Sequence, residues 1–147
     1  MDAVREGETS GGTAVPRPQR PVAFVDSSAI VALVDRDDAT HEAAVEAYRS
    51  LVESGYKLFT TNHVVVEAYN LLCAGVGPDV ARQWLREMRL AIYHADEDDE
   101  EKARRMVANA KGMRVLSLTD AISLVVMERL GVSDAFAVDP NFLAEMS

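Results

Sequence analysis

Short apolar runs alternate with amphipathic segments from Pro21 to the end of the chain. The apolar runs predict strands over 22–26, 57–61, 91–95 and 135–138, with a short extended piece at most over 114–116. Apolar residues at helical spacing between these runs predict helices over 27–34, 38–54, 62–74, 79–90, 97–111 and 118–130. Repeated strand–helix alternation with short apolar strands predicts an α/β fold with a mainly parallel central sheet.

The N-terminal segment has a different composition. Residues 1–21 combine Gly, Ser, Thr, Pro and charged residues with almost no large apolar side chain, so we expect a disordered tail over 1–21 and one domain over 22–147. The tail lacks the apolar core of a signal peptide, and no apolar run approaches the length of roughly 18 residues that a membrane helix needs. The lone Cys73 cannot form a disulfide within the chain, which favours a cytoplasmic protein.

Four acidic residues lie in apolar surroundings, far apart in the sequence. Asp26 ends the run VAFVD, Glu67 lies within TTNHVVVEAYNLL, Asp120 begins an apolar helix, and Asp139 closes AFAVD. Burying an unpaired carboxylate costs several kcal/mol or shifts its pKa until it is neutral. We therefore expect a cation, most simply a divalent metal, to gather the four.

Each of these acids also has a structural interpretation. Asp26 is a favoured residue for capping the helix that follows it, and Asp120 with Ser117 fits a capping box. Asp139 precedes a proline, as residues that start turns do, and Glu67 is compatible with an ion pair to an arginine. However, the carboxyl ends of parallel strands meet at one edge of a sheet, so all four side chains can point into one crevice.

The chemistry of the candidate ligands narrows the choice of metal. Oxygen ligands without Cys/His spacing indicate Mg²⁺ or Mn²⁺ rather than zinc. Ser28 is placed to hydrogen-bond a carboxylate and orient it. His63 shares a helix face with Glu67, which is compatible with a metal but more often incidental.

The charge balance bears on nucleic acid as a partner. The chain has 15 Lys and Arg against 24 Asp and Glu, a net charge of −9, which argues against a broad electrostatic grip on phosphates. An acidic metal cluster would carry up to four of those charges, and a bound metal inverts the local field. Nucleic acid therefore stays possible, held by a metal and by a local basic patch.

The segments VAFVDSSAIVALVDRDDATHEAAVEAY, TTNHVVVEAYNLL and LSLTDAISLVVMERLGVSDAFAVDPNF resemble the PIN-domain proteins, and most closely the VapC-type toxin ribonucleases. The resemblance spans about residues 22–143. It implies a PIN-like three-layer α/β/α sandwich and an endoribonuclease that depends on Mg²⁺ or Mn²⁺. It also implies frequent homodimerisation and, in the toxin branch, inhibition by a small antitoxin protein.

Carried over by position, the supporting hydroxyl of the family falls on Ser28, and its four acids fall on Asp26, Glu67, Asp120 and Asp139. One position departs from the family pattern. The family usually has Thr or Ser two residues before the last acid, where this chain has Ala137, so the hold on Asp139 is in question.

This set of residues predicts a mechanism, and other functions stay open beside it. A dication bound mainly by Asp26 and Asp120, with Glu67 and Asp139 closing the cluster, would polarise a phosphodiester of single-stranded RNA and lower the pKa of a bound water. Candidate phosphate contacts lie at helical spacing, although a solvated helix face is the plainer interpretation: Arg82, Arg86 and Arg89. The alternative function is a catalytically silent PIN-like module that binds RNA or a protein partner. A haloacid-dehalogenase type phosphatase would need an acid where Ser28 stands.

Overall fold

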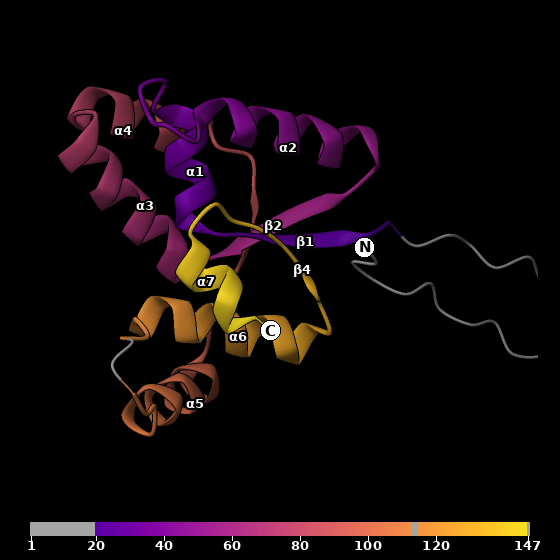
Figure 1. Ribbon diagram of the computed structural model, residues 1–147, viewed down its shortest axis with the longest axis vertical. Coiled ribbons are helices and arrows are strands. Elements are labelled where there is room, and N and C mark those ends of the chain that lie inside the picture. The colour runs from indigo at the N-terminus through magenta and orange to yellow at the C-terminus, as the bar shows by residue number, and fades with distance from the viewer. Residues whose placement is uncertain (1–19, 113–114, 147) are drawn as a thin grey trace, which may run out of the picture.

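The computed structural model describes residues 20–112 and 115–146, and its centre is a four-stranded parallel sheet (Figure 1). The strand order is β3-β2-β1-β4, and every neighbouring pair is parallel. The strands are β1 (Val22–Val25), β2 (Lys57–Thr61), β3 (Ala91–Tyr93) and β4 (Asp134–Phe136). The predicted parallel α/β arrangement is confirmed, and all four carboxyl ends lie at one edge of the sheet.

Helices cover both faces of this sheet. In Figure 1, α1 and α2 lie on one side and α5 and α6 on the other, while α3 and α4 lie beside α1. The helices are α1 (Ser27–Val34), α2 (His41–Glu53), α3 (Asn62–Gly75), α4 (Pro78–Glu87), α5 (Glu97–Ala108), α6 (Leu118–Leu130) and α7 (Pro140–Glu145). The result is a three-layer α/β/α sandwich. None of the helices in the described ranges is long and apolar enough to cross a membrane.

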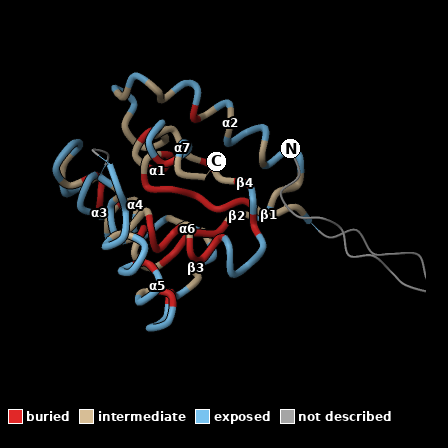
Figure 2. The backbone as a smooth tube through the Cα atoms, turned by 60° about the horizontal axis from the view of Figure 1, so that its bottom comes forward, coloured by how far each residue is buried: buried red, intermediate tan, exposed pale blue. Residues whose placement is uncertain are grey.

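The core forms around β1, in which three of four residues are buried, and α6, which buries six residues (Figure 2). Phe24 of β1 is fully buried, and its ring centroid lies 5.7 Å from that of Phe59 in β2 and 5.9 Å from that of Phe142 in α7. α6 buries residues on several sides, including Ala121, Ile122 and Val126. The strand β1 and the start of α6 are therefore held rigidly, and each leads directly to a candidate site residue.

The end of the chain differs from the sequence-based prediction. The predicted strand 135–138 is wrong at both ends: β4 ends at Phe136, and a helix that was not predicted, α7, begins at Pro140. Asp139 is the N-cap of α7 and accepts a hydrogen bond of 2.9 Å from the backbone N–H of Asn141. Proline at the first helical position has no N–H to satisfy, so Asp-Pro starts a helix here rather than a simple turn.

Other boundaries move by a few residues. The helix predicted from 38 begins only at His41, because Asp38 accepts the N–H of Thr40 in a local turn. The helices predicted to reach 90 and 111 end at Glu87 and Ala108, and the strand predicted to reach 95 ends at Tyr93. In the predicted extended piece 114–116, residue 114 lies outside the described residues, and 115–116 belong to no strand.

Two buried acids are held by partners within the fold. Asp99 is fully buried and forms a reciprocal capping box with Asp96 at the start of α5, and its Oδ1 lies 2.7 Å from the guanidinium Nε of Arg129 in α6. That oxygen has the cation beside it although the contact lacks hydrogen-bond geometry. Asp134 is also buried and accepts a 2.8 Å hydrogen bond from the hydroxyl of Tyr56. These two acids have partners within the fold, and the four candidate ligands can be compared with them.

The packing of α7 against β1 predicts a measurable contribution to stability. Replacing Phe142 by Ala leaves a cavity beside Phe24, so we expect Phe142→Ala to lower the free energy of unfolding by about 3–5 kcal/mol in urea denaturation. The matched control is Leu143→Ala in the same helix, whose side chain is 42% exposed and should cost about 1 kcal/mol or less. Equal losses for the two variants would show that α7 is not packed as described.

Candidate active site

Asp26 uses one carboxylate oxygen to cap α1 and keeps the other for a further partner. Its Oδ2 accepts hydrogen bonds from the backbone N–H of Ser28 at 3.0 Å and from the Ser28 hydroxyl at 2.6 Å. Its Oδ1 is buried without a hydrogen-bond partner, and the residue is only 2% exposed. Capping and ligand binding are therefore not alternatives at this position, because each uses a different oxygen.

Ser28 joins the end of β1 to the segment after β4. Its hydroxyl donates to Asp26 and accepts hydrogen bonds from the backbone N–H groups of Val138 at 3.1 Å and Asp139 at 3.3 Å. One hydroxyl donates once and accepts twice, so its full capacity is used. The backbone N–H groups of Val138 and Asp139 are thus held by Ser28, although position 137 carries no hydroxyl.

Glu67 reaches the same region from α3. It is the sixth residue of that helix, and its Oε1 accepts a 2.6 Å hydrogen bond from the hydroxyl of Ser27. The ion pairs found among the described residues do not include Glu67, so the predicted alternative of an arginine partner is not observed. Ser27 was not predicted as a site residue, since its place beside Ser28 directly after the strand was the one signal that the sequence offered.

The charges of the other three acids act on Asp120. It lies in the first turn of α6, where its backbone N–H donates to the Ser117 hydroxyl at 3.0 Å. Burial raises the pKa of Asp120 most, and repulsion from Asp26, Glu67 and Asp139 adds to this, so that the pKa reaches about 6 despite the Ser117 contact. Three segments more than 40 residues apart therefore place their carboxylates within electrostatic reach of Asp120.

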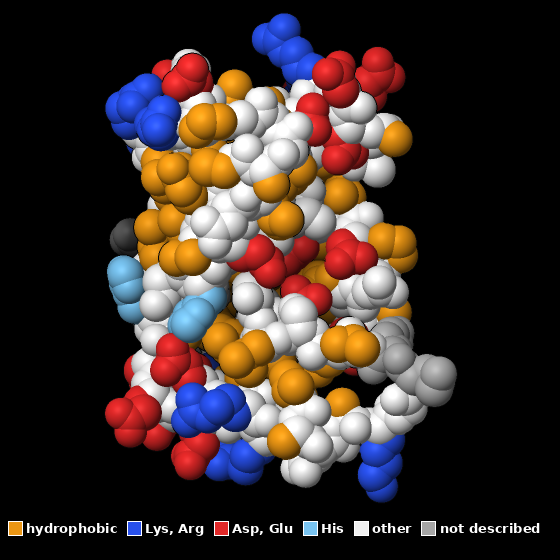
Figure 3. Space-filling model, turned by 90° about the vertical axis from the view of Figure 1, so that its left-hand side faces the viewer, with side chains coloured by type: hydrophobic (Ala, Val, Ile, Leu, Met, Phe, Trp, Pro, Cys, Tyr) orange, Lys and Arg blue, Asp and Glu red, His pale blue; other side chains and the backbone are white. Residues whose placement is uncertain are grey.

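The pKa of Asp26 shifts in the same direction for the same reasons. Burial raises it most, the hydrogen bonds from Ser28 and Ser27 oppose that rise, and the charge of Asp139 adds to it. Figure 3 shows Asp and Glu side chains gathered in the middle of one face, beside a hollow of the surface. The ion pairs among the described residues do not include these four acids, unlike Asp99, whose partner is the guanidinium of Arg129.

The chemistry of these four side chains fits a hard divalent cation. They offer only carboxylate oxygens, one of which is the buried, unpartnered Oδ1 of Asp26. Within 20–112 and 115–146, however, no group of three Asp, Glu, His or Cys side chains already stands in the arrangement of a metal site. Binding would therefore require the carboxylates to rotate toward a shared point.

Of the three arginines predicted to contact phosphate, two lie within α4 and one lies beyond its end. Arg82 and Arg86 lie within the helix, and Arg82 pairs with Asp79 at 3.1 Å. Arg89 lies two residues beyond the helix, and its guanidinium donates to the carbonyl oxygens of Arg86, Glu87 and Met88 at its end. The three arginines thus do not share one helix face, and Arg89 forms part of the helix ending.

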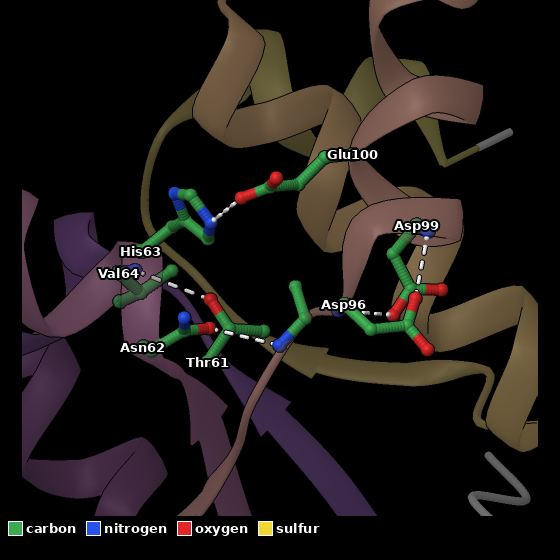
Figure 4. Close-up of polar contacts among 8 residues, drawn as sticks. Thr61, Asn62, His63, Val64, Asp96, Asp99 and Glu100 are labelled. Atoms are coloured by element: carbon green, nitrogen blue, oxygen red, sulfur yellow. Dashed lines mark hydrogen bonds and ion pairs between the residues drawn. The ribbon is translucent and has the colours of Figure 1, made fainter.

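His63 has a partner other than the acidic cluster. Its Nε2 lies 2.8 Å from Oε2 of Glu100 in α5, and Figure 4 shows the two side chains pointing toward each other across the gap between the helices. The predicted proximity of His63 and Glu67 on one face of α3 holds, since both line the same groove. Nothing in the sequence pattern indicated the contact with Glu100, because it joins two helices 37 residues apart.

Comparisons with known proteins agree on one family. A family model described as the PIN domain matches residues 23–144. The chain is 32% identical over 124 residues to the 23S rRNA-specific endonuclease VapC20 of Mycobacterium tuberculosis, in strains CDC 1551 / Oshkosh and ATCC 25618 / H37Rv, covering 82% of this chain and 92% of that protein. The crystal structure of M. tuberculosis VapC20, described as a sarcin–ricin loop cleaving toxin, superposes with a TM-score of 0.72 at 30% identity, covering 84% of this chain and 94% of that one.

The repulsion around Asp120 predicts a gain in stability when its charge is removed. In metal-free protein above pH 7 the folded state carries an unfavourable charge, so Asp120→Asn should raise the free energy of unfolding by about 1–2 kcal/mol, after allowance for solvent screening. The folded carboxyl has a pKa of about 6 and the unfolded one the ordinary 3.8. The gain should therefore shrink as pH falls from 6 to 4, because the folded wild type then takes up the proton first.

The measurement is urea denaturation in EDTA at pH 7.5 and pH 4. Asp37→Asn is the matched control, because Asp37 is exposed and follows the far end of α1 from Asp26. A loss of stability for Asp120→Asn at pH 7.5, or a gain that does not depend on pH, would contradict the described cluster.

Proposed function

The chain belongs to the PIN-domain family, and we propose on that basis that it is a metal-dependent endoribonuclease, the toxin of a type II toxin–antitoxin pair. The observation that carries the proposal is the convergence of four carboxylates from separate segments. Burial raises the pKa of Asp120 most, and the charges of Asp26, Glu67 and Asp139 add to this, so that the pKa reaches about 6. Like charges held together destabilise the folded state, and a bound dication turns that repulsion into attraction.

The proposed metal is Mg²⁺ or Mn²⁺. Asp26 and Asp120 would bind it most directly, with Glu67 and Asp139 completing the cluster. The charges of Asp26, Glu67 and Asp139 all act on Asp120, which supports a shared site for the four acids. When bound, such an ion polarises a phosphodiester and lowers the pKa of a water molecule. The residues of this chain orient two of the carboxylates, through the hydroxyl groups of Ser27 and Ser28.

The hydroxyl groups supply the orientation. Ser28 fixes Oδ2 of Asp26, which leaves Oδ1 directed elsewhere, and Ser27 fixes Oε1 of Glu67. Because Ser28 also holds the backbone N–H of Asp139, a single side chain sets the relative position of the first and last acids. Such supporting contacts are typically worth a factor of 10–100 in metal affinity or activity.

We propose RNA as the substrate, with the 23S rRNA as the first molecule to test. The relatives with 32% identity are named 23S rRNA-specific endonucleases, and the similar crystal structure is that of a sarcin–ricin loop cleaving toxin. The net charge of −9 gives little general attraction to RNA, so phosphate binding would depend on the metal and on local cations. Arg82, Arg86 and Arg89 remain candidates for that contact.

The proposed partners follow from the same family. We expect a small antitoxin protein, a homodimer, and action in the cytoplasm. Away from α3, the described residues expose large apolar side chains, a surface of the kind that protein partners cover: Tyr48, Val52 and Leu85. Light scattering of the purified chain, alone and with the product of the neighbouring gene, tests both partners.

The alternative function is a catalytically silent module that binds RNA or protein. Its support is the missing hydroxyl at Ala137 and the acidic charge balance, whereas the hydrogen bonds from Val138 and Asp139 to Ser28 show that the backbone there is held without that hydroxyl. An RNase assay with and without Mn²⁺ separates the two functions. Cleavage that requires the metal favours the enzyme, and RNA binding without any cleavage favours the module.

Removing one proposed ligand should abolish the activity. We expect Asp26→Asn to reduce metal-dependent cleavage of a 23S rRNA fragment by at least about a hundredfold, more than the loss of a supporting contact, because a primary ligand is lost. Asp37→Asn, in an exposed loop, should cleave like the wild type. Cleavage by Asp26→Asn at the wild-type rate would rule out the proposed site.

Removing the Ser28 hydroxyl should have a smaller and reversible effect. Ser28→Ala should lower cleavage by about 10–100-fold and raise the Mn²⁺ concentration needed for half-maximal activity. Ser28→Thr, which keeps the hydroxyl, should restore most of the activity at the same metal concentration. Equal activity of the alanine and threonine variants would show that the hydroxyl does not orient Asp26.

A further inference from the structure

A groove of about 530 Å³ adjoins the acidic cluster and shares only Glu67 with the proposed metal ligands. One face of α3 forms most of it, and Thr119, the neighbour of Asp120 in α6, forms the rest. Its lining consists of Asn62, His63, Val66, Glu67, Asn70, Leu71 and Thr119. Glu67 thus belongs both to the cluster and to the wall of the groove, so a molecule in the groove would lie beside the reacting phosphate.

This face of α3 is unusual because it exposes apolar side chains. Val66 is 62% exposed and Leu71 is 47% exposed, whereas Val64, Ala68 and Leu72 of the same helix are fully buried. The groove therefore combines two accessible apolar side chains with amide and imidazole groups. Small-molecule sites have this mixture of an apolar wall with a few polar groups, and the volume suits one nucleobase with its ribose.

The imidazole of His63 is held in one orientation by Glu100. An ionised carboxylate only accepts hydrogen bonds, so Nε2 of His63 carries the hydrogen in the 2.8 Å contact. In the neutral ring Nδ1 is then the acceptor that a ligand would meet. Figure 4 shows His63 on α3 and Glu100 on α5, and Figure 3 shows histidine side chains beside the acidic group on the same face.

The amides of the groove differ in how firmly they are held. Oδ1 of Asn62 accepts a 2.9 Å hydrogen bond from the backbone N–H of Ala95, which fixes its side chain to the segment after β3. Asn70 is exposed two turns further along α3. Asn70 belongs to the same lining and can offer its carbonyl oxygen as a second acceptor in the groove.

We propose that this groove binds one unstacked nucleobase next to the cleaved phosphate, and that His63 and Asn70 select a base that has an exocyclic amino group. The inference rests on the proposed ribonuclease function. Unstacked bases of single-stranded RNA are read through hydrogen bonds at their edges, and adenine, cytosine and guanine carry an amino group where uracil does not. Glu100 is a positioning residue that acts through His63.

The negative charge around the groove favours the same choice. Glu67 lines the groove together with His63, and Glu100 contacts His63, so the potential there favours N–H donors over carbonyl oxygens. Uracil would turn a carbonyl oxygen toward the acceptor Nδ1 and leave both without a hydrogen bond. Selection against uracil at one position is therefore the specific consequence.

The test uses the full chain with Mn²⁺ on a stem-loop RNA library whose loop is randomised, with sequencing of the cleaved products. Wild type should cut loops that carry uracil at one position beside the cleaved bond about tenfold less often, the equivalent of one hydrogen bond. His63→Ala should reduce cleavage of the preferred loops about tenfold, to the uracil level. Glu100→Gln should lose part of that preference, and His94→Ala, an exposed histidine outside the groove, should keep it.

Each outcome decides between the proposals. A wild-type profile in His63→Ala, or equal use of all four bases by wild type at every flanking position, overturns the groove while the ribonuclease stands. Asn70→Ala, a change at an exposed position, provides the same readout if His63→Ala proves unfolded by circular dichroism. If wild type cleaves no RNA with Mn²⁺ or Mg²⁺, the proposed function fails and the groove proposal fails with it.

Discussion

The repulsion among four carboxylates at one edge of a parallel sheet is the constraint on which the site depends. Parallel strands end side by side, so an acid after β1 and another after β4 are neighbours although 113 positions separate them. The helices α3 and α6 bring the other two to the same edge. Burial and the charges of the other three acids together raise the pKa of Asp120 to about 6, which reflects the cost in free energy of an ionised carboxylate at this position. The fold tolerates the cost because the rest of the core is well packed.

Serine hydroxyls make the arrangement specific. Ser27 holds Glu67, Ser28 holds Asp26 together with the backbone of Asp139, and Ser117 caps the helix that carries Asp120. A hydroxyl can hold a carboxylate without neutralising it, whereas an arginine would both hold it and cancel its charge. The contrast with Asp99, paired with Arg129, shows how this chain treats an acid that serves only the fold.

Much of this could be predicted from the sequence, and the failures have a common cause. Strands, helices and the four acids were recognisable because each leaves a local pattern, such as an apolar run that ends in Asp26. The helix α7 was missed because Asp139 and Pro140 begin a turn or a helix with the same residues. Boundaries at Thr40 and Glu87 depend on side-chain contacts with the backbone, which periodicity does not register.

Contacts between segments far apart in the chain could not be predicted from the sequence, for a physical reason. The Ser27–Glu67 and His63–Glu100 pairs join residues 40 and 37 positions apart, and their formation depends on how helices pack against one another. Ser28 is the exception, since its neighbour Asp26 was already suspected. Its second role, bonding the backbone before Asp139, appears only when β1 and β4 lie side by side.

The same constraint orders the events of the proposed reaction. A phosphate approaching four uncompensated carboxylates meets repulsion that a chain of net charge −9 does little to offset. The dication must therefore bind before or with the RNA, because only it reverses the local field. The groove lined by His63 and Asn70 recognises an uncharged base edge, so its contribution does not depend on phosphate attraction. Metal binding would then govern whether RNA binds, and the groove would govern which bond is cut.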